Sequence, residues 1–287
     1  MLCESSRNSG SPATLSLSLA QQVLYPRTPN LGHRRTCVVQ FFLDTASLKE
    51  IEDFARQGFA DGVTTNQRII LSEGNVDLKK RILDICKVVD GPVSVETTKS
   101  TVADLVAEGR EYASWHKNIV VKVAMYGDGR GLEVVHRLTK ERIKTNMTAM
   151  MTFNQLVLAA KAGATYVSLF YNRAIEAGEN PNQIIRDYAA VSKEGNHPAR
   201  LIVGSIRKPE DVAQAIASGA HIMTVPSKIL KQMCYNKRTE ETIEEFDKAW
   251  AEFLAMKKPA AERGPVSGAP VIPSRASPAR STSKQGA

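Results

Sequence analysis

The stretch IVVKVAMYGDGRGLEVVHRLTKER, residues 119–142, joins a short β-branched run to an amphipathic helical pattern. Strand alternation over residues 119–124 places Lys122 on one face with Val120 and Ala124. The same strand-then-helix unit occurs eight times between residues 38 and 234, and a ninth helical pattern follows over 239–257. Alternating units of this kind force parallel strands, and eight in about 220 residues are typical of a closed (β/α)8 TIM barrel.

The expected strands recur at regular intervals along the chain. They cover residues 38–44, 62–66, 92–97, 119–124, 143–150, 165–171, 200–205 and 221–226. An open doubly wound sheet is the alternative, but no GxGxxG motif follows the first strand to indicate a dinucleotide site. The sequence therefore favours the α/β class, with a single barrel and a C-terminal helix over residues 38–256.

The net charge of +8 comes from the two ends of the chain. Residues 1–37 hold four arginines against one glutamate, and residues 257–287 hold six lysines or arginines against one glutamate. We expect a disordered leader over 1–37, whose composition also suits an organelle transit peptide, and a disordered basic Pro/Ser-rich tail over 257–287. The neutral middle predicts no nucleic-acid partner, and no apolar run reaches the roughly 20 residues that span a bilayer, which predicts no membrane partner.

The cysteines and histidines show no metal-ligand or disulfide spacing. The four cysteines, Cys3, Cys37, Cys86 and Cys234, are widely separated, and the five histidines form no HxH or HxxxH pair. We therefore expect no bound metal and reduced thiols, with the cytoplasm as the default location.

Polar residues collect where the expected strands end, which is where barrel enzymes carry their active sites. Each of several has a structural explanation when taken alone: Lys122 could extend to water, Asp44 and Ser205 could cap helices, and Asn66 could serve a turn. Glu96 is different, because a carboxylate on a buried strand face needs a partner. Together they predict a polar pocket over the barrel mouth. The residues at the strand ends are Asp44, Thr65, Asn66, Glu96, Lys122, Asn146, Thr148, Ser168, Phe170 and Ser205, with Arg173 and Arg207 just beyond.

This set of side chains limits the chemistry of the pocket. A buried lysine amine can form a Schiff base with a ketone, and two carboxylates can move protons on and off the intermediates. Arg173, Ser205 and Arg207 are donors suited to a phosphate dianion. The pattern indicates carbon–carbon bond chemistry on a phosphorylated sugar.

Seven motifs, in order and each at a strand end, carry a resemblance to a known family. They are FFLDTAS, GVTTN, VSVET, IVVKV, TNMTAM, YVSLFYNR and GSIR. Between Val38 and Met256 the chain resembles the transaldolases and the related fructose 6-phosphate aldolases. The resemblance implies transfer of a dihydroxyacetone unit between sugar phosphates in the pentose phosphate pathway, without a cofactor.

The resemblance also implies roles for individual residues. Lys122 would form the Schiff base, Asp44 would take the proton of the C4 hydroxyl, and Glu96 with Thr148 would act through a water molecule. The residues implied to bind substrate are Thr65, Asn66, Asn146, Ser168, Phe170, Arg173, Ser205 and Arg207.

Two positions bear on the fate of the three-carbon intermediate. Aldolase-type members carry glutamine at the position of Glu96 and tyrosine at the position of Phe170, so this chain resembles the transaldolases. The alternatives are a lyase that releases dihydroxyacetone and a non-catalytic sugar-phosphate-binding paralogue. Gln67 and Arg68 depart from the family's usual proline and small hydroxyl residue after TTN.

The last helical pattern carries an apolar stripe: Ile243, Phe246, Trp250, Phe253 and Leu254. The chain resembles the short branch of the family, which implies a homo-oligomer, a decamer in that branch, with the final helix packed on a neighbouring subunit. An intrachain lid is the alternative.

Overall fold

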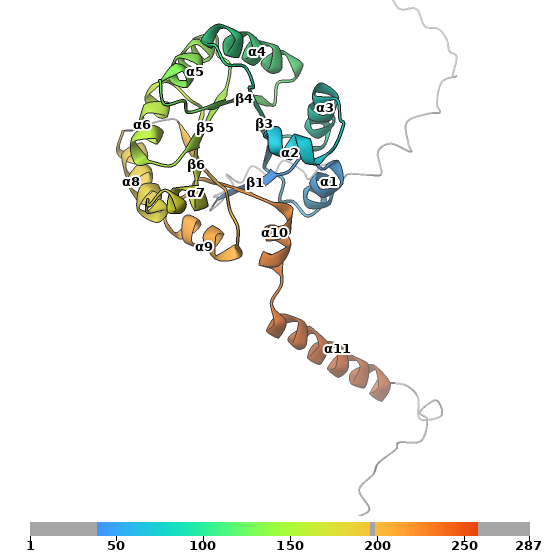
Figure 1. Ribbon diagram of the computed structural model, residues 1–287. Helices are drawn as coiled ribbons and strands as arrows, with labels where there is room; N and C mark the ends of the chain where they lie inside the picture. The colour runs from blue at the N-terminus through green and yellow to red at the C-terminus, as the bar shows by residue number, and fades with distance from the viewer. Residues whose placement is uncertain (1–38, 196–198, 258–287) are drawn as a thin grey trace, which may run out of the picture. The chain divides into compact units, whose positions relative to one another are not determined.

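A computed structural model describes residues 39–195 and 199–257 of the chain. Eight parallel strands pair in sequence order, and the pairing of β1 with β8 closes the barrel. Figure 1 shows the strands at the centre of a ring formed by helices α1 to α10. This confirms the predicted (β/α)8 barrel. The strands are β1 (Gln40–Asp44), β2 (Gly62–Thr64), β3 (Val93–Glu96), β4 (Ile119–Ala124), β5 (Thr145–Met150), β6 (Tyr166–Phe170), β7 (Arg200–Gly204) and β8 (Ile222–Val225).

The helices follow the strands as the sequence predicts, with two additions. The short helices α2 and α7 occupy the segments after β2 and β6, where the sequence pattern predicts no helix. Both have only six residues, too few for helical periodicity to stand out. The helices are α1 (Leu48–Arg56), α2 (Gln67–Ser72), α3 (Leu78–Val88), α4 (Val102–Trp115), α5 (Arg130–Lys140), α6 (Phe153–Lys161), α7 (Tyr171–Glu176), α8 (Pro181–Glu194), α9 (Pro209–Ala217), α10 (Ser227–Cys234) and α11 (Lys237–Lys257).

The barrel interior changes from apolar to polar along the strands. Near the strand beginnings, Phe42, Ile202 and Ile222 form a buried cluster against which Tyr166 packs. Gly62 makes room for Phe42, because a Cβ atom at this glycine would lie 2.7 Å from the phenyl ring. Two residues further along β1, β6 and β8 the cavity-lining residues are polar, Asp44, Ser168 and Thr224, so the apolar layer forms the floor beneath a polar mouth.

The outer faces of the strands form the main core with the helices. Val121 and Val123 of β4 are fully buried there, as the alternation around Lys122 predicts. The helices dock through amphipathic stripes, for example Val134, Val135 and Leu138 of α5. This layer fixes the strands rigidly, which holds their ends in place.

The predicted leader over 1–37 lies outside the described residues, and so does the predicted tail over 257–287 apart from Lys257, which ends α11. Helix α11 has no buried residue, and its apolar stripe is exposed, with Trp250 stacked on Phe253 at 5.1 Å. A lid that packed on its own barrel would bury this stripe, so the exposed stripe does not fit the intrachain-lid alternative. In the described part of the chain no helix combines the length and the hydropathy that crossing a membrane requires.

Candidate active site

Lys122 lies on the inner face of β4 and does not extend to water. The residue is 4% exposed, and its Nζ atom lies 3.1 Å from Glu96 Oε2 and donates a hydrogen bond of 3.1 Å to the Thr65 carbonyl. The register of β3 and β4 places Glu96 directly beside Lys122. The amine is therefore buried and held by a carboxylate, which excludes the alternative that Lys122 extends to water.

Asp44 ends β1 with its carboxylate inside the barrel mouth. It accepts a hydrogen bond of 2.9 Å from Thr64 Oγ1. Burial raises the pKa of Asp44, and the negative charge of Glu96 raises it further. The charge of Lys122 and the hydrogen bond from Thr64 lower this pKa, but by less, so the pKa of Asp44 lies above its usual value. Because Ser47 is the N-cap of α1, Asp44 does not cap that helix. A carboxyl with a raised pKa is a suitable general base near neutral pH.

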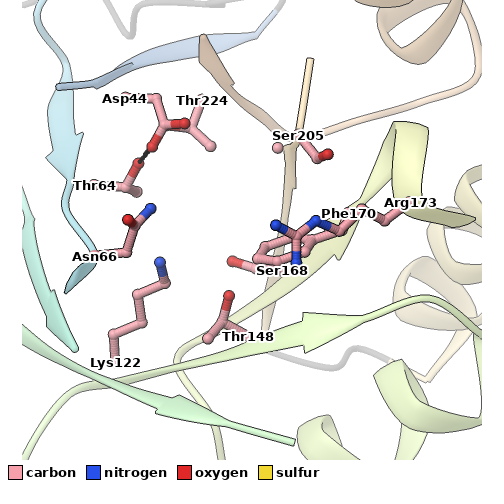
Figure 2. Close-up of a pocket in the computed structure, with 11 residues that line it drawn as sticks. Asp44, Thr64, Asn66, Lys122, Thr148, Ser168, Phe170, Arg173, Ser205 and Thr224 are labelled. Carbon is pink, nitrogen blue, oxygen red and sulfur yellow. Dashed lines mark hydrogen bonds between the residues drawn. The ribbon is translucent and has the colours of Figure 1, made fainter. Parts of the chain in front are cut away.

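A cavity of about 120 Å³ lies over the barrel mouth. In Figure 2, Asp44, Asn66 and Lys122 lie on one side and Arg173 and Ser205 on the other. The cavity thus has a lysine–carboxylate side and a cationic side, which suits a substrate with a carbonyl at one end and an anion at the other. Eight of the twelve predicted site residues line it: Asp44, Asn66, Lys122, Thr148, Ser168, Phe170, Arg173 and Ser205.

Two of the remaining predicted residues line an adjacent pocket of about 320 Å³. Glu96 and Thr65 lie there, and Asn66 borders both pockets. Thr65 donates its hydroxyl to the Ser94 carbonyl at 2.8 Å, so it contacts Lys122 through its own carbonyl and not through its side chain. Glu96 therefore contacts Lys122 from the adjacent pocket, which shares Asn66 with the main cavity.

Asn146 and Arg207 do not line the main cavity. Asn146 is fully buried, and it donates to Ser94 Oγ at 3.2 Å and accepts from Ser168 Oγ at 2.7 Å. The Arg207 guanidinium forms a 2.5 Å ion pair with Glu176, and both side chains are more than half exposed. In this arrangement Asn146 orients Ser168, and Arg173 is the arginine that lines the cavity.

Thr148 carries a buried hydroxyl without a hydrogen-bond partner among the described residues. The register of β5 and β6 shifts between Met147 and Met150, and Ala149 adopts a positive φ of 59°. Such a bulge re-aims the side chains around it. Because Thr148 lines the cavity, its hydroxyl is available to a polar group bound there.

Ser205 follows β7 in a left-handed conformation with φ of 59°. Its carbonyl accepts a 2.9 Å hydrogen bond from Asn172 Nδ2, which helps to hold this uncommon backbone geometry. Lys208, and not Ser205, is the N-cap of α9, so the helix-cap alternative for Ser205 is wrong. Arg173 lies 5.3 Å over the ring of Phe170 on the same side of the cavity. These residues form the cationic side.

Asn66 caps a helix, where the structural alternative expected a turn, and it also borders the cavity. Its Oδ1 atom accepts a 2.9 Å hydrogen bond from the Ile69 N–H and caps α2. The cap leaves the amide NH2 group as a donor for a ligand.

The comparisons with known proteins agree with this geometry. Residues 41–262 match the family described as Transaldolase/Fructose-6-phosphate aldolase. The chain belongs to this family.

Several curated members of the family are similar to the chain over nearly their whole length. The "Probable transaldolase" of Thermoanaerobacter sp. (strain X514) is 42% identical over 212 residues, 74% of this chain and 97% of the relative. The "Probable transaldolase 1" of Listeria monocytogenes serotype 4b (strain F2365) is 41% identical over 220 residues, 77% of this chain and 100% of the relative. The "Probable transaldolase" of Streptococcus equi subsp. zooepidemicus (strain MGCS10565) is 40% identical over 215 residues, 75% of this chain and 99% of the relative. The resemblance seen in the sequence motifs is confirmed.

Sequence reasoning missed three residues of the cavity in this family member: Thr64, Gly204 and Thr224. The Thr64 and Thr224 hydroxyls lie 2.6 Å apart, and Thr64 passes a hydrogen bond on to Asp44. A Cβ atom at Gly204 would lie 2.9 Å from Thr224. Strand alternation could have found both threonines, because Thr64 and Thr224 each occupy an inward position near a strand end.

Proposed function

We propose that the chain is a transaldolase that moves a dihydroxyacetone unit from a ketose phosphate, fructose 6-phosphate or sedoheptulose 7-phosphate, to an aldose phosphate. One observation carries the proposal. The buried amine of Lys122 lies 3.1 Å from the Glu96 carboxylate and lines the same cavity as the carboxylate of Asp44. Burial raises the pKa of Asp44. An amine between two carboxylates of different environment suits Schiff-base chemistry with separate proton-transfer roles.

The first half of the reaction builds the Schiff base. Lys122 gives a proton to Glu96 across 3.1 Å, and the neutral amine attacks C2 of the ketose. The resulting carbinolamine loses its hydroxyl as water, with the proton supplied by Glu96. Thr148, whose buried hydroxyl has no partner among the described residues, holds the departing water. The product is an iminium ion on Lys122.

The second half breaks and re-forms the carbon–carbon bond. Asp44 takes the proton of the C4 hydroxyl, the C3–C4 bond breaks, and its electron pair moves into the C2–C3 bond as the iminium nitrogen becomes an enamine nitrogen. The aldose leaves with an aldehyde at its former C4. The enamine then attacks the aldehyde of a second aldose phosphate, and Asp44 returns the proton to the new hydroxyl. Hydrolysis of the Schiff base regenerates Lys122.

The cationic side of the cavity holds the substrate phosphate in this proposal. Arg173 and the Ser205 hydroxyl supply the donors, and Ser168 is oriented by Asn146. A charged guanidinium and a fixed hydroxyl favour a phosphate dianion. Arg207 contributes once it leaves Glu176. Asn66 donates its amide to a hydroxyl of the dihydroxyacetone unit.

Phe170 supports transfer over release. Release of dihydroxyacetone requires a proton for C3 of the enamine, and a phenol at position 170 could donate one through water. Phe170 has no hydroxyl, and among the described residues the lining of the cavity contains no tyrosine. The enamine therefore persists until an acceptor aldehyde binds.

Product analysis tests the proposed function directly. With fructose 6-phosphate and erythrose 4-phosphate we expect sedoheptulose 7-phosphate and glyceraldehyde 3-phosphate in equal amounts. Release of dihydroxyacetone at the same rate without an acceptor would indicate the lyase. Binding of sugar phosphate with no turnover would indicate a non-catalytic paralogue.

We further propose a homo-oligomer that acts in the pentose phosphate pathway in the cytoplasm. The exposed stripe of α11, which includes Phe246, Trp250 and Leu254, supports the oligomer because isolated apolar stripes are rarely left in water. Sedimentation of the full chain tests it, and a monomeric mass would contradict it. Microscopy of a C-terminal fluorescent fusion tests the location, and an organellar signal would favour the transit-peptide interpretation of residues 1–37.

A further inference from the structure

A buried carboxylate outside the cavity holds the loop that follows Glu96. Glu108 of α4 is 7% exposed and accepts four hydrogen bonds. The donors are Thr98 N at 2.7 Å, Thr98 Oγ1 at 2.7 Å, Lys99 N at 3.2 Å and Tyr112 Oη at 2.8 Å. Across residues 39–195 and 199–257, no lysine or arginine forms an ion pair with it. A buried carboxylate with neutral donors only is costly unless those hydrogen bonds are kept.

The hydrogen bonds keep Glu108 ionised. Burial raises the pKa of Glu108, but the bonds from Thr98, Tyr112 and Lys99 outweigh it and hold the pKa below its usual range. The carboxylate can therefore accept all four bonds at neutral pH. Two of them come from backbone N–H groups, so Glu108 acts on the path of the main chain.

The loop held by Glu108 connects Glu96 to α4. Thr97, between Glu96 and Thr98, donates its N–H to the Lys122 carbonyl at 2.9 Å and its hydroxyl to the same atom at 3.2 Å. The segment after Glu96 is therefore attached to β4 by Thr97 and to α4 by Thr98 and Lys99. Gln67 also donates to the Thr97 carbonyl at 3.3 Å, and Arg130 donates to the Ser100 carbonyl at 2.7 Å. Loss of the attachment to α4 would remove the hydrogen bonds to the N–H groups of Thr98 and Lys99, directly behind Glu96.

The Glu96 side chain has little support from other side chains. Within the described part of the chain, its one polar side-chain contact is the 3.1 Å ion pair with Lys122, and the side chain is 15% exposed. A carboxylate with a single side-chain contact takes its position from its own backbone. We propose that Glu108 is a positioning residue for Glu96, which keeps the carboxylate within proton-transfer distance of the Lys122 amine during Schiff-base formation.

This inference rests on the proposed role of Glu96 and is tested by a double-mutant cycle in the full chain. The rate of Schiff-base formation with fructose 6-phosphate is measured by rapid borohydride trapping and mass spectrometry. Glu108→Ala should slow trapping by about 10²-fold, because displacing a catalytic group by about 1 Å costs roughly that factor. In the Glu96→Gln background, which has lost the proton-transfer group, Glu108→Ala should have almost no further effect.

Two variants give the cycle its controls. Glu108→Gln should keep most of the rate, because its amide oxygen can accept both backbone N–H groups and its NH2 can donate to the two hydroxyls. Asp211→Ala removes a matched carboxylate that is 2% exposed and accepts from Arg207 N at 3.0 Å and Lys208 N at 3.2 Å. It should slow trapping by the same factor in both backgrounds, since it supports the other side of the cavity.

The outcomes separate the two proposals. If Glu96→Gln slows trapping and Glu108→Ala adds an equal factor in both backgrounds, Glu108 is structural only and the positioning role is wrong. If Glu96→Gln leaves trapping unchanged, the proposed role of Glu96 fails and the positioning role fails with it. Should circular dichroism show that Glu108→Ala is unfolded, Thr98→Val, which removes one donor to Glu108, replaces it in the same cycle with the same expectation.

Discussion

Replacing Thr64 with valine tests whether Asp44 acts as the ionised base. Thr64 Oγ1 donates a 2.9 Å hydrogen bond to the Asp44 carboxylate and receives one from Thr224 at 2.6 Å. This bond lowers the pKa of Asp44, against the larger effect of burial. Thr64→Val removes the donor with little change in volume, so the pKa of Asp44 rises further.

The size of the effect follows from the kind of bond that is lost. A hydrogen bond to a charged group contributes about 1.5–3 kcal/mol. At about 1.4 kcal/mol per tenfold change, the ionised fraction of Asp44 at acidic pH falls about 10- to 150-fold. The base must be ionised to take the C4 proton, so the acidic limb of the activity profile moves to higher pH, and activity on the alkaline plateau stays close to wild type.

The assay is the pH dependence of fructose 6-phosphate cleavage with a saturating acceptor. Thr64→Ser, which keeps the hydroxyl, should retain the wild-type profile. Thr224→Val should move the limb less, because the bond from Thr64 to Asp44 remains. An unchanged acidic limb in Thr64→Val would refute the assignment of Asp44 as the titrating base.

Three further substitutions probe the cleavage step, the phosphate side and the barrel floor. Asp44→Asn should still form the Schiff base but leave the donor uncleaved, which mass spectrometry detects as a six-carbon adduct after reduction; a three-carbon adduct would contradict the role of Asp44. Arg173→Ala should raise KM for fructose 6-phosphate about 10- to 150-fold, from the loss of charged hydrogen bonds of about 1.5–3 kcal/mol, but leave KM for unphosphorylated fructose unchanged. An equal rise for both sugars would place the phosphate elsewhere. Gly62→Ala should destabilise the barrel by about 1–3 kcal/mol in urea unfolding, because the new Cβ atom would lie 2.7 Å from the Phe42 ring and 2.8 Å from the Pro92 carbonyl. Unchanged stability would contradict the close packing of the floor.

The fold and the location of the site were predictable because both depend on periodic patterns. Strand alternation places Lys122 on the face opposite Val121 and Val123, and parallel strands bring their carboxyl ends to one face of the barrel, where Asp44 and Ser205 meet in one cavity. The register that sets Glu96 beside Lys122 also follows from neighbouring strands in a barrel.

The details that escaped prediction depend on side-chain direction and barrel closure. The contact of Thr64 with Thr224 joins residues 160 positions apart and exists because β1 pairs with β8. Arg207 forms its ion pair with Glu176 of α7, a helix too short for periodicity to reveal. The hydrogen bonds of Asn146 with Ser94 and Ser168 likewise depend on side-chain directions that the order of residues does not specify.

Borohydride reduction of the protein in the presence of fructose 6-phosphate, followed by peptide mass spectrometry, tests the central claim most directly. We expect a three-carbon adduct on Lys122, which would establish both the Schiff base and cleavage of the C3–C4 bond. An unmodified Lys122 in folded protein, or an adduct on another lysine, would contradict the assignment of Lys122 as the nucleophile.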